Sequence, residues 1–393
     1  MNKTVDPLYF SELECPVCKN INKFENIRAG SYSESGKDKD FKPTGRVWLN
    51  QAYQKFDPLL FFMATCSKCY YTREFTQEYK SWSKDTSFKT YRLKAVQQSH
   101  LSELSAQDNV IKFLGDNIDQ QNYPFESAVI KLLLGIYDTK ISGRPSNLDI
   151  GRYFLRVAWL FRDQTDQGQE EATGNAGFFR QLRDAASKIN QIVPDYDDKV
   201  ANLKRMMDND FPIVFGNVPE AEGHKKKIEQ TIEEINSALA PLAKAGSKLM
   251  SVFSDTEKAL LGQEMSQGGA FHNYTSFTSF LTLARDKWDE VPLNEHDAMI
   301  KAAEYYQKAY EAGGEISQGI QQVQAAYMIA ELSRRAGNTK NADQFFNQTI
   351  RMGREMVMGK QADQSSINFI KNLLEIAMEQ ARLTKKQETG VTA

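Results

Sequence analysis

The spacing of apolar residues divides the chain into a strand-like N-terminal part and a longer helical part. Before about residue 125, aromatic stretches are punctuated by glycine and proline, as in short strands and turns, and residues 59–65 have the pattern of a strand. From about Glu126, apolar residues recur every three or four positions, which indicates helices. The pattern predicts helices over 127–138 and 147–162, separated by a turn at 143–147. We therefore expect a mainly α protein with a small β part at its N-terminus.

Two stretches of the helical part have the alternation of large and small residues that is typical of tetratricopeptide repeats. The early positions are Phe154, Val157, Ala158 and Phe161, with a second helix expected over 178–189. The late positions, within about 295–353, are Ile329, Ala330, Gly337, Ala342 and Phe346, preceded by Ala302, Tyr306 and Ala309. The loop after residue 162 is too long for a consensus repeat, so we predict an irregular tetratricopeptide-like body. A generic helical bundle is the alternative.

Between these stretches the apolar period changes to 3.5 residues. From Ile228 to Phe253 the steps alternate between four and three, as in the seam of a coiled coil. Pro241 and Gly246 lie inside the seam and predict a kinked or broken helix. The seam is expected to pack within its own chain as a helical hairpin, with a homo-oligomer as the alternative.

The candidate chemistry lies in two CxxC pairs, Cys15 with Cys18 and Cys66 with Cys69, which are the only cysteines of the chain. Two residues between thiolates allow both to bind one tetrahedral ion, and a redox role would use only one of the pairs. Four thiolates leave no open coordination position. We therefore predict one structural Zn²⁺ per chain and no catalytic metal. The four histidines form no ligand pair and are expected to be ordinary surface or packing residues.

These patterns together predict five segments. They are a zinc-ribbon domain over 1–100, a first helical-repeat segment over 101–195, a helical hairpin or coiled-coil-like insertion over 196–290, C-terminal tetratricopeptide-like repeats over 291–382, and a disordered tail over 383–393.

Composition narrows the choice of partners and compartment. A net charge of −2 gives no global cationic field for nucleic acid or anionic membranes. No basic start precedes an apolar run, and no segment is long enough to cross a bilayer, so we expect a cytoplasmic protein without membrane insertion.

The first hundred residues allow one local exception to this charge balance. They hold 16 Lys and Arg against 11 Asp and Glu, a net of +5. The interleaved aromatic residues are Tyr32, Phe41, Trp48, Tyr53 and Tyr71. This mixture suits RNA or single-stranded DNA. The same residues also suit the core and the solubility of a small ribbon.

The N-terminal motifs resemble a bacterial family of unknown function. The matching elements are Cys15-Pro16-Val17-Cys18, Asp38-Lys39-Asp40-Phe41, Asp57-Pro58, Cys66-Ser67-Lys68-Cys69-Tyr70-Tyr71 and the helical residues 153–162. The resemblance spans about residues 10–190 and implies a zinc ribbon followed by tetratricopeptide-like helices, but no activity. Tyr70 replaces the usual glycine after the last cysteine, and Asp57 replaces an asparagine.

We predict a non-enzymatic adaptor or scaffold that binds one or more proteins. No catalytic triad, glycine-rich cradle or open metal site can be assembled from these motifs. In the early repeat, Arg152, Arg156 and Trp159 fall on the groove face and could hold an acidic, aromatic-bearing peptide. Alternatively, the arginines pair with carboxylates of adjacent helices and Trp159 is a core residue. Binding of RNA or single-stranded DNA through the ribbon is the second functional hypothesis.

Overall fold

The computed structural model describes residues 6–54, 56–107, 109–170, 276–359 and 363–388, together with 199–216, 218, 222–237 and scattered residues from 239 to 274. The chain divides into two compact units, one formed by 1–164 with 269–393 and the other by 165–268. The zinc ribbon and the C-terminal helices, which the sequence pattern assigns to separate segments, therefore belong to the same unit.

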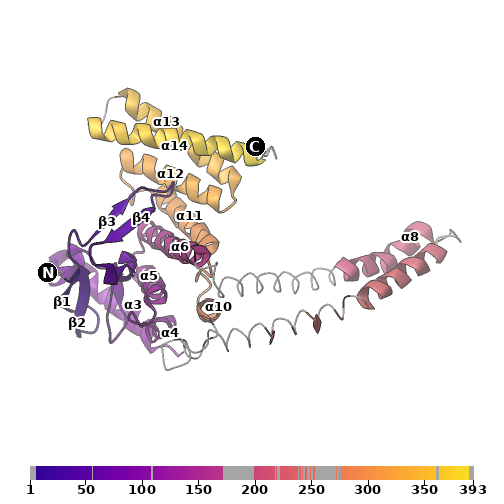
Figure 1. Cartoon of the computed structure of the whole chain (residues 1–393), viewed down its shortest axis with the longest axis horizontal. Helices are drawn as coiled ribbons and strands as arrows, with labels where there is room; N and C mark the ends of the chain where they lie inside the picture. Colours follow the sequence, from indigo (N-terminus) through magenta and orange to yellow (C-terminus); the bar gives the residue numbers. More distant parts are fainter. Residues whose placement is uncertain are drawn as a thin grey trace. The chain divides into compact units, whose positions relative to one another are not determined.

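Among the described residues, three antiparallel hairpins make up the β part, and the strands of the first two are labelled in Figure 1. Their strands are β1 (Leu8–Glu14) with β2 (Ile21–Ile27), β3 (Tyr32–Ser35) with β4 (Gly45–Trp48), and β5 (Met63–Thr65) with β6 (Thr72–Glu74). Along β2, Asn22, Phe24 and Asn26 are buried and alternate with more exposed residues, which is the two-residue period of a strand with one covered face. Phe24 packs in one apolar cluster with the cysteines.

The strand expected over 59–65 forms only from Met63. The 3₁₀-helix η2 (Pro58–Phe61) precedes it. The Asp57 carboxylate accepts a hydrogen bond from the Leu59 amide at 2.7 Å, and the ring of Pro58 fixes φ near a helical value. This cap and the proline together favour a helical turn over an extended start.

Short helices link the hairpins to the helical body. They are η1 (Gln51–Tyr53), α1 (Gln77–Lys80), η3 (Trp82–Lys84), α2 (Thr86–Tyr91), α3 (Leu93–Ser105) and α4 (Val110–Gly115). The two helices that the sequence predicts first are confirmed as α5 (Pro124–Ile141) and α6 (Asn147–Glu170). Helix α5 is buried over most of its length, in agreement with its nearly continuous apolar run.

The C-terminal part is a series of helices, and those from residue 295 onward each pack against the next (Figure 1). They are α10 (Phe277–Lys287), α11 (Glu295–Ala312), α12 (Ile320–Arg335), α13 (Thr339–Gly359) and α14 (Gln364–Glu388). The repeat positions Ile329, Ala330, Ala342 and Phe346 are fully buried, and Gly337 turns the chain between α12 and α13 with φ of 77°. The mainly α fold with N-terminal β hairpins is confirmed.

The expected disordered tail over 383–393 is wrong for its first residues. Helix α14 continues to Glu388, and the side chain of Thr384 is fully buried. The periodicity of α14 rests here on threonine and glutamine, which an apolar pattern does not detect.

Most described residues of the 165–268 unit are helical, including the short helix α8 (Phe211–Phe215). In the predicted seam, Ile232 is buried, whereas Ile228 is 38% exposed. Pro241 lies in a helical conformation, and Gly246 lies outside the described residues, as does the second helix expected over 178–189.

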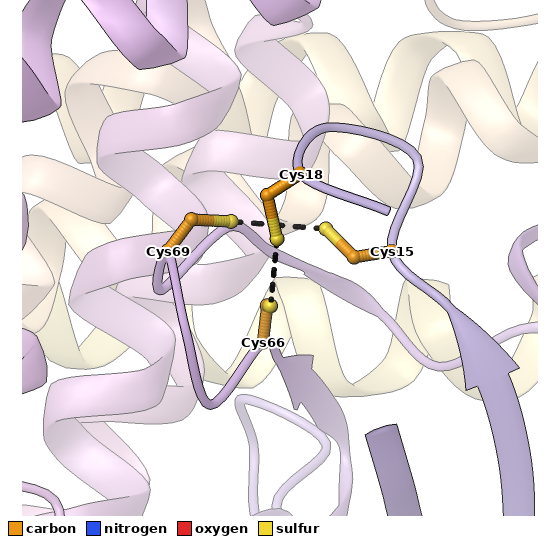
Figure 2. A group of neighbouring side chains, drawn as sticks. All are labelled: Cys15, Cys18, Cys66 and Cys69. Carbon is orange, nitrogen blue, oxygen red and sulfur yellow. Dashed lines mark hydrogen bonds between the residues drawn. The ribbon is translucent and has the colours of Figure 1, made fainter. Parts of the chain in front are cut away.

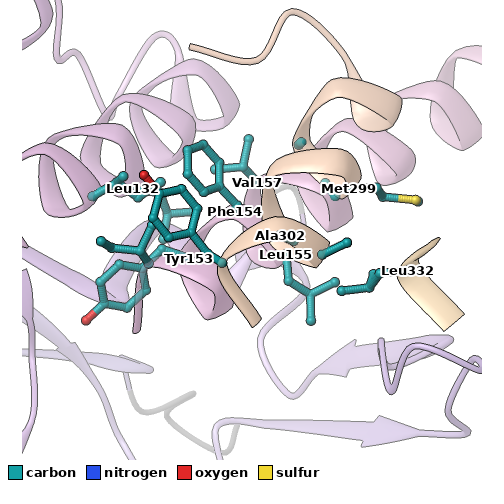
Figure 3. Packing of buried hydrophobic residues seen from close by; sticks show 14 of the residues in the cluster. Leu132, Tyr153, Phe154, Leu155, Val157, Met299, Ala302 and Leu332 are labelled. Atoms are coloured by element: carbon teal, nitrogen blue, oxygen red, sulfur yellow. The ribbon is translucent and has the colours of Figure 1, made fainter. Parts of the chain in front are cut away.

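One large apolar core joins the β part to the helices. It contains Leu60, Phe61 and Met63 of the N-terminal part together with residues of α5, α6, α11 and α12. Figure 3 shows part of this core, with Leu132 of α5, Phe154 and Val157 of α6, and Met299 and Ala302 of α11. The ring of Phe154 stacks on Tyr305 with centroids 5.8 Å apart. Ribbon and helices therefore share their main source of hydrophobic stabilisation. Within the described part, no helix is both long and apolar enough to span a bilayer.

Candidate metal centre

Two backbone turns of the same geometry carry the four cysteines. In the first, the Lys19 amide donates to the Cys15 carbonyl at 3.0 Å, and in the second the Tyr70 amide donates to the Cys66 carbonyl at 2.9 Å. The residue after the last cysteine of each pair has φ of 62°, although neither Lys19 nor Tyr70 is glycine. The positive φ turns each chain back into a hairpin, so that both thiols of a pair face the same side.

The four sulfurs converge on one point (Figure 2). Cys15 Sγ lies 3.7 Å from Cys69 Sγ, Cys18 Sγ lies 3.5 Å from Cys66 Sγ, and all four lie within 4.8 Å of one another. A tetrahedral zinc ion with Zn–S bonds of about 2.3 Å places sulfurs roughly 3.8 Å apart. The all-sulfur donor set and these distances fit zinc, and the predicted ligand set is brought together in full.

Hydrogen-bond donors already surround the sulfurs. The Val17 amide lies 3.4 Å from Cys15 Sγ, and the Lys68 amide lies 3.5 Å from Cys66 Sγ. The side-chain amide of Asn22 also donates to Cys66 Sγ at 3.5 Å. Hydrogen bonds from neighbouring thiols, that of Cys15 first, and from amides lower the pKa of the Cys66 thiol. These donors favour the thiolate form of Cys66, which metal binding requires.

His100 ties the second cysteine turn to α5, a role that the sequence does not reveal. Its Nε2 lies 2.8 Å from the carbonyl oxygen of Cys69, and its Nδ1 lies 2.6 Å from Asp138 Oδ1. Asp138 also accepts a hydrogen bond from the Thr72 amide at 2.7 Å. Burial by itself lowers the pKa of His100, but the hydrogen bond and charge of Asp138 outweigh this and raise it. A carbonyl and a carboxylate oxygen are acceptors, so both ring nitrogens are placed to donate.

Tyr70 makes a second link between this turn and the helices. Its ring lies against Gly115, where an added Cβ would be 2.2 Å from Tyr70 Cγ. Its hydroxyl donates to Asp116 Oδ1 at 2.5 Å. Tyr70, which stands where the family usually has a glycine, therefore adopts a left-handed backbone conformation, and its side chain contacts the end of α4.

The three predicted partner-binding residues are partly buried, and each contacts a residue of the N-terminal part. Arg152 lies 3.1 Å from Asp149 and 3.7 Å from Glu74, and Arg156 lies 4.3 Å from the ring centroid of Phe62. The Trp159 indole N–H donates to Asp40 Oδ2 at 3.2 Å. Arg156 and Trp159 also line a pocket of about 410 Å³.

The tip of the β3–β4 hairpin, residues 38–41, lies between α6 and α12. We call this stretch the tip segment; its sequence is Asp38-Lys39-Asp40-Phe41. Asp40 is fully buried and pairs with Arg162 at 2.7 Å, while Asp38 pairs with Arg162 at 2.9 Å and with Arg335 at 3.0 Å. Sequence patterns give no sign of these contacts, because up to about 300 residues separate the partners.

Tyr327 of α12 completes the surroundings of the tip segment. Its hydroxyl donates to the Lys39 carbonyl at 2.7 Å, and its ring lies 5.6 Å from that of Phe41. We call Trp159, Arg162, Tyr327 and Arg335 the receptor residues.

The fold and the four-cysteine cluster define a mainly helical protein with a structural metal site in its N-terminal hairpins. The chain belongs to a bacterial family described as "Uncharacterized protein conserved in bacteria (DUF2225)", which matches residues 8–191 and 275–373. The resemblance to a bacterial family of unknown function is thereby confirmed. No curated protein and no solved structure matches the chain.

Proposed function

We propose that this protein is a non-enzymatic adaptor that binds a partner protein through an acidic, aromatic-bearing segment laid across α6 and α12. One observation carries the proposal: the chain's own tip segment has this chemistry and occupies this place. Its two carboxylates meet two arginines, its aromatic ring meets Tyr327, and its backbone carbonyl accepts a hydrogen bond from the same tyrosine. The tip segment is a short linear stretch, which is the form in which another protein can present an equivalent sequence.

The proposal retains Trp159 from the residues singled out in the sequence and replaces Arg152 and Arg156 by Arg162 and Arg335. Both terminal guanidinium nitrogens of Arg152 already pair with carboxylates, those of Asp149 and Glu74. The guanidinium of Arg156 lies over the ring of Phe62. Arg162, in contrast, points at the tip segment and also pairs with Glu295 at 2.6 Å. Guanidinium groups suit this task because their planar donors match carboxylates.

The polar character of the contact between the tip segment and the receptor residues favours replacement of the tip segment by a partner over permanent packing. Buried ion pairs contribute little net stability compared with apolar packing, although they fix geometry strongly. Phe41 has φ of 64°, an unfavourable conformation for a residue with a Cβ, and this strain is relieved when the tip segment leaves. When it leaves, the arginines retain Glu295 and Glu331 as partners.

In this proposal the metal centre is a structural zinc site. Closed four-sulfur coordination holds the two cysteine turns together and offers no position for a substrate. The second hypothesis, binding of nucleic acid, has less support, because Trp48 and Tyr71 are buried and cannot stack on bases. Absence of a mobility shift of labelled RNA at low salt would remove it.

The test uses a fluorescent peptide with the sequence of residues 36–44 and a full-length variant with Asp38→Gly, Lys39→Ser, Asp40→Gly and Phe41→Ser. Circular dichroism and zinc content first establish that the variant is folded. We expect this variant to bind the peptide about a hundredfold more tightly than the wild type does, because a tethered segment competes at an effective concentration on the order of millimolar.

Two controls make the test specific. A peptide with both aspartates changed to asparagine, and the same protein variant carrying Arg162→Ala, should each lose most of the binding. Failure of the folded variant to bind the unmodified peptide would contradict the proposal and leave the tip segment as a fixed part of the fold.

A further inference from the structure

A cavity of about 810 Å³ lies between the β1–β2 hairpin, the second cysteine turn and the loop that joins α4 to α5. Its volume falls in the range of small-molecule sites, which combine apolar walls with a few convergent polar groups. We propose that this cavity binds a small molecule that carries one carboxylate on an apolar body, with Lys131 as the counter-ion. The inference is independent of the proposed adaptor function.

Lys131 is the group that points to a ligand. Its side chain belongs to α5 and is only 6% exposed, yet its ammonium meets two neutral acceptors, the Leu60 carbonyl at 2.6 Å and Gln120 Oε1 at 2.8 Å. Within the described residues no carboxylate forms an ion pair with it. A buried ammonium without a counter-ion is costly, and a bound anion would remove that cost.

The carboxylates around the cavity are already engaged. Asp116 accepts the hydroxyl of Tyr70, and Asp119 accepts both nitrogens of Asn122. Glu25 accepts the side-chain amide of Gln120 at 3.2 Å and influences Lys131 only from a distance. Of the charged residues that line the cavity, Lys131 alone is buried, since Lys23 and Asp116 are exposed and the other two carboxylates are half-buried. Water screens the exposed charges, so a head group at the buried ammonium gains most if it is anionic.

The remaining walls suit an apolar body. Phe24, Phe61, Met63, Phe75 and Ile118 line the cavity. Two further observations are typical of functional sites. Tyr70, which also lines the cavity, has a strained left-handed backbone, and burial lowers the pKa of Lys131 to about 8.

The experiment uses phenylacetate and its neutral amide, phenylacetamide, as probes of the full-length zinc-loaded protein. Binding is followed by the ¹³C-methyl resonance of Met63, assigned with a Met63→Leu variant. We expect a saturable shift with phenylacetate and at least about tenfold weaker binding of the amide, because the neutral amide cannot form an ion pair with the Lys131 ammonium.

Two lysine variants locate the charge that matters. Lys131→Met should weaken phenylacetate binding at least about tenfold and leave phenylacetamide binding unchanged. Lys112→Met is the control, because Lys112 is exposed on α4 and does not line the cavity; the affinity of this variant should equal that of the wild type.

The comparison of the two probes on the wild-type protein does not depend on the folding of any variant. Equal binding of acid and amide, or no shift of the Met63 methyl with either, overturns the proposal. Equal loss of phenylacetate binding in Lys112→Met and Lys131→Met also overturns it.

Discussion

At the scale of single residues, position 70 has a left-handed backbone, which glycine usually adopts, but it is occupied by a tyrosine whose side chain makes compensating contacts. A left-handed φ costs a residue with a Cβ about 1 kcal/mol relative to glycine. Tyr70 accepts this cost and contributes a ring contact with Gly115 and a hydrogen bond to Asp116. The two positions are therefore coupled, since only glycine at 115 leaves room for the ring.

This coupling predicts a double-mutant cycle. Gly115→Ala alone should destabilise the protein by about 2 kcal/mol, because its methyl group would overlap the Tyr70 ring. In a Tyr70→Gly background the same change should be neutral or stabilising, since alanine favours the helix. Urea unfolding of the four proteins measures the coupling. Equal effects of Gly115→Ala in both backgrounds would show that the ring does not fill this space.

Lys131 predicts a pH dependence of stability. Burial lowers its folded-state pKa from 10.5 to about 8, so between pH 8 and 10 the unfolded chain keeps a proton that the folded chain has released. This difference makes the folded state more stable as the pH rises. The free energy of unfolding of the wild type relative to Lys131→Met should therefore increase by about 2–3 kcal/mol from pH 7 to pH 10.

Nearby groups do not obscure this trend. The other charged residues that line the cavity are the same in both proteins, so their contributions cancel in the comparison. Burial, followed by the hydrogen bond to Asp116, raises the pKa of Tyr70 to about 12. A difference between the two proteins that stays constant from pH 7 to pH 10 would mean that Lys131 is well solvated.

The sequence could reveal the metal ligands but not the residues that position them. The two cysteines of each pair lie three positions apart, and this spacing can be recognised in the sequence because a single backbone turn brings both thiols to one metal ion. His100 and Asp138 lie 38 residues apart and meet only because α3 and α5 pack on the same side of the second cysteine turn. Contacts that depend on packing between distant elements leave no periodic signal in a single sequence.

At the scale of elements, apolar periodicity predicted helices well where the apolar residues were many. The helices at 127–138 and 147–162 were predicted for this reason. Periodicity was less successful at 59–65, where the Asp57-Pro58 cap decides the local structure, and after residue 382, where buried positions are polar.

The end of α14 provides an element-scale prediction. Thr384→Lys should destabilise the protein by about 2 kcal/mol or more, because Thr384 is fully buried and its hydroxyl already bonds to the Gln380 carbonyl at 2.8 Å. Leu383→Lys is the neighbouring control, since Leu383 is 43% exposed, and should change stability by less than about 0.5 kcal/mol. Thermal unfolding measures the stability of both variants. Equal changes in their melting temperatures would show that residue 384 is not packed against the rest of the protein.

At the scale of the whole molecule, the family match and the division into units set apart overlapping stretches of the chain. The match omits residues 192–274, most of which belong to the 165–268 unit. Helix α10, which the sequence pattern assigns to the insertion, packs its Phe280 against Phe113 and belongs to the main unit. The match therefore covers the part of the chain that contains the metal centre and the receptor residues.

Because the ribbon and the helices share one apolar core, loss of the metal should destabilise some helices as well as the ribbon. From the sequence, Cys66→Ser is expected to unfold the ribbon and leave the helices intact. In the structure, α5 depends on the ribbon: Met63 packs on Gly135, Lys131 binds the Leu60 carbonyl, and Asp138 binds the Thr72 amide. Loss of these contacts should loosen α5 together with the cysteine turns.

We therefore predict that Cys66→Ser, or removal of zinc by a chelator, lowers the free energy of unfolding by several kcal/mol, because metal binding supplies folding free energy. Hydrogen exchange should show that the amides of α5 lose protection along with those of β5 and β6, whereas the amides of α13 and α14 keep theirs, since those helices pack mainly on each other and on α12. Lys68→Ser, at an exposed position between the same two cysteines, is the control and should behave as the wild type. If α5 keeps full protection in the metal-free protein, the ribbon folds as an independent domain and the shared core does not couple the two.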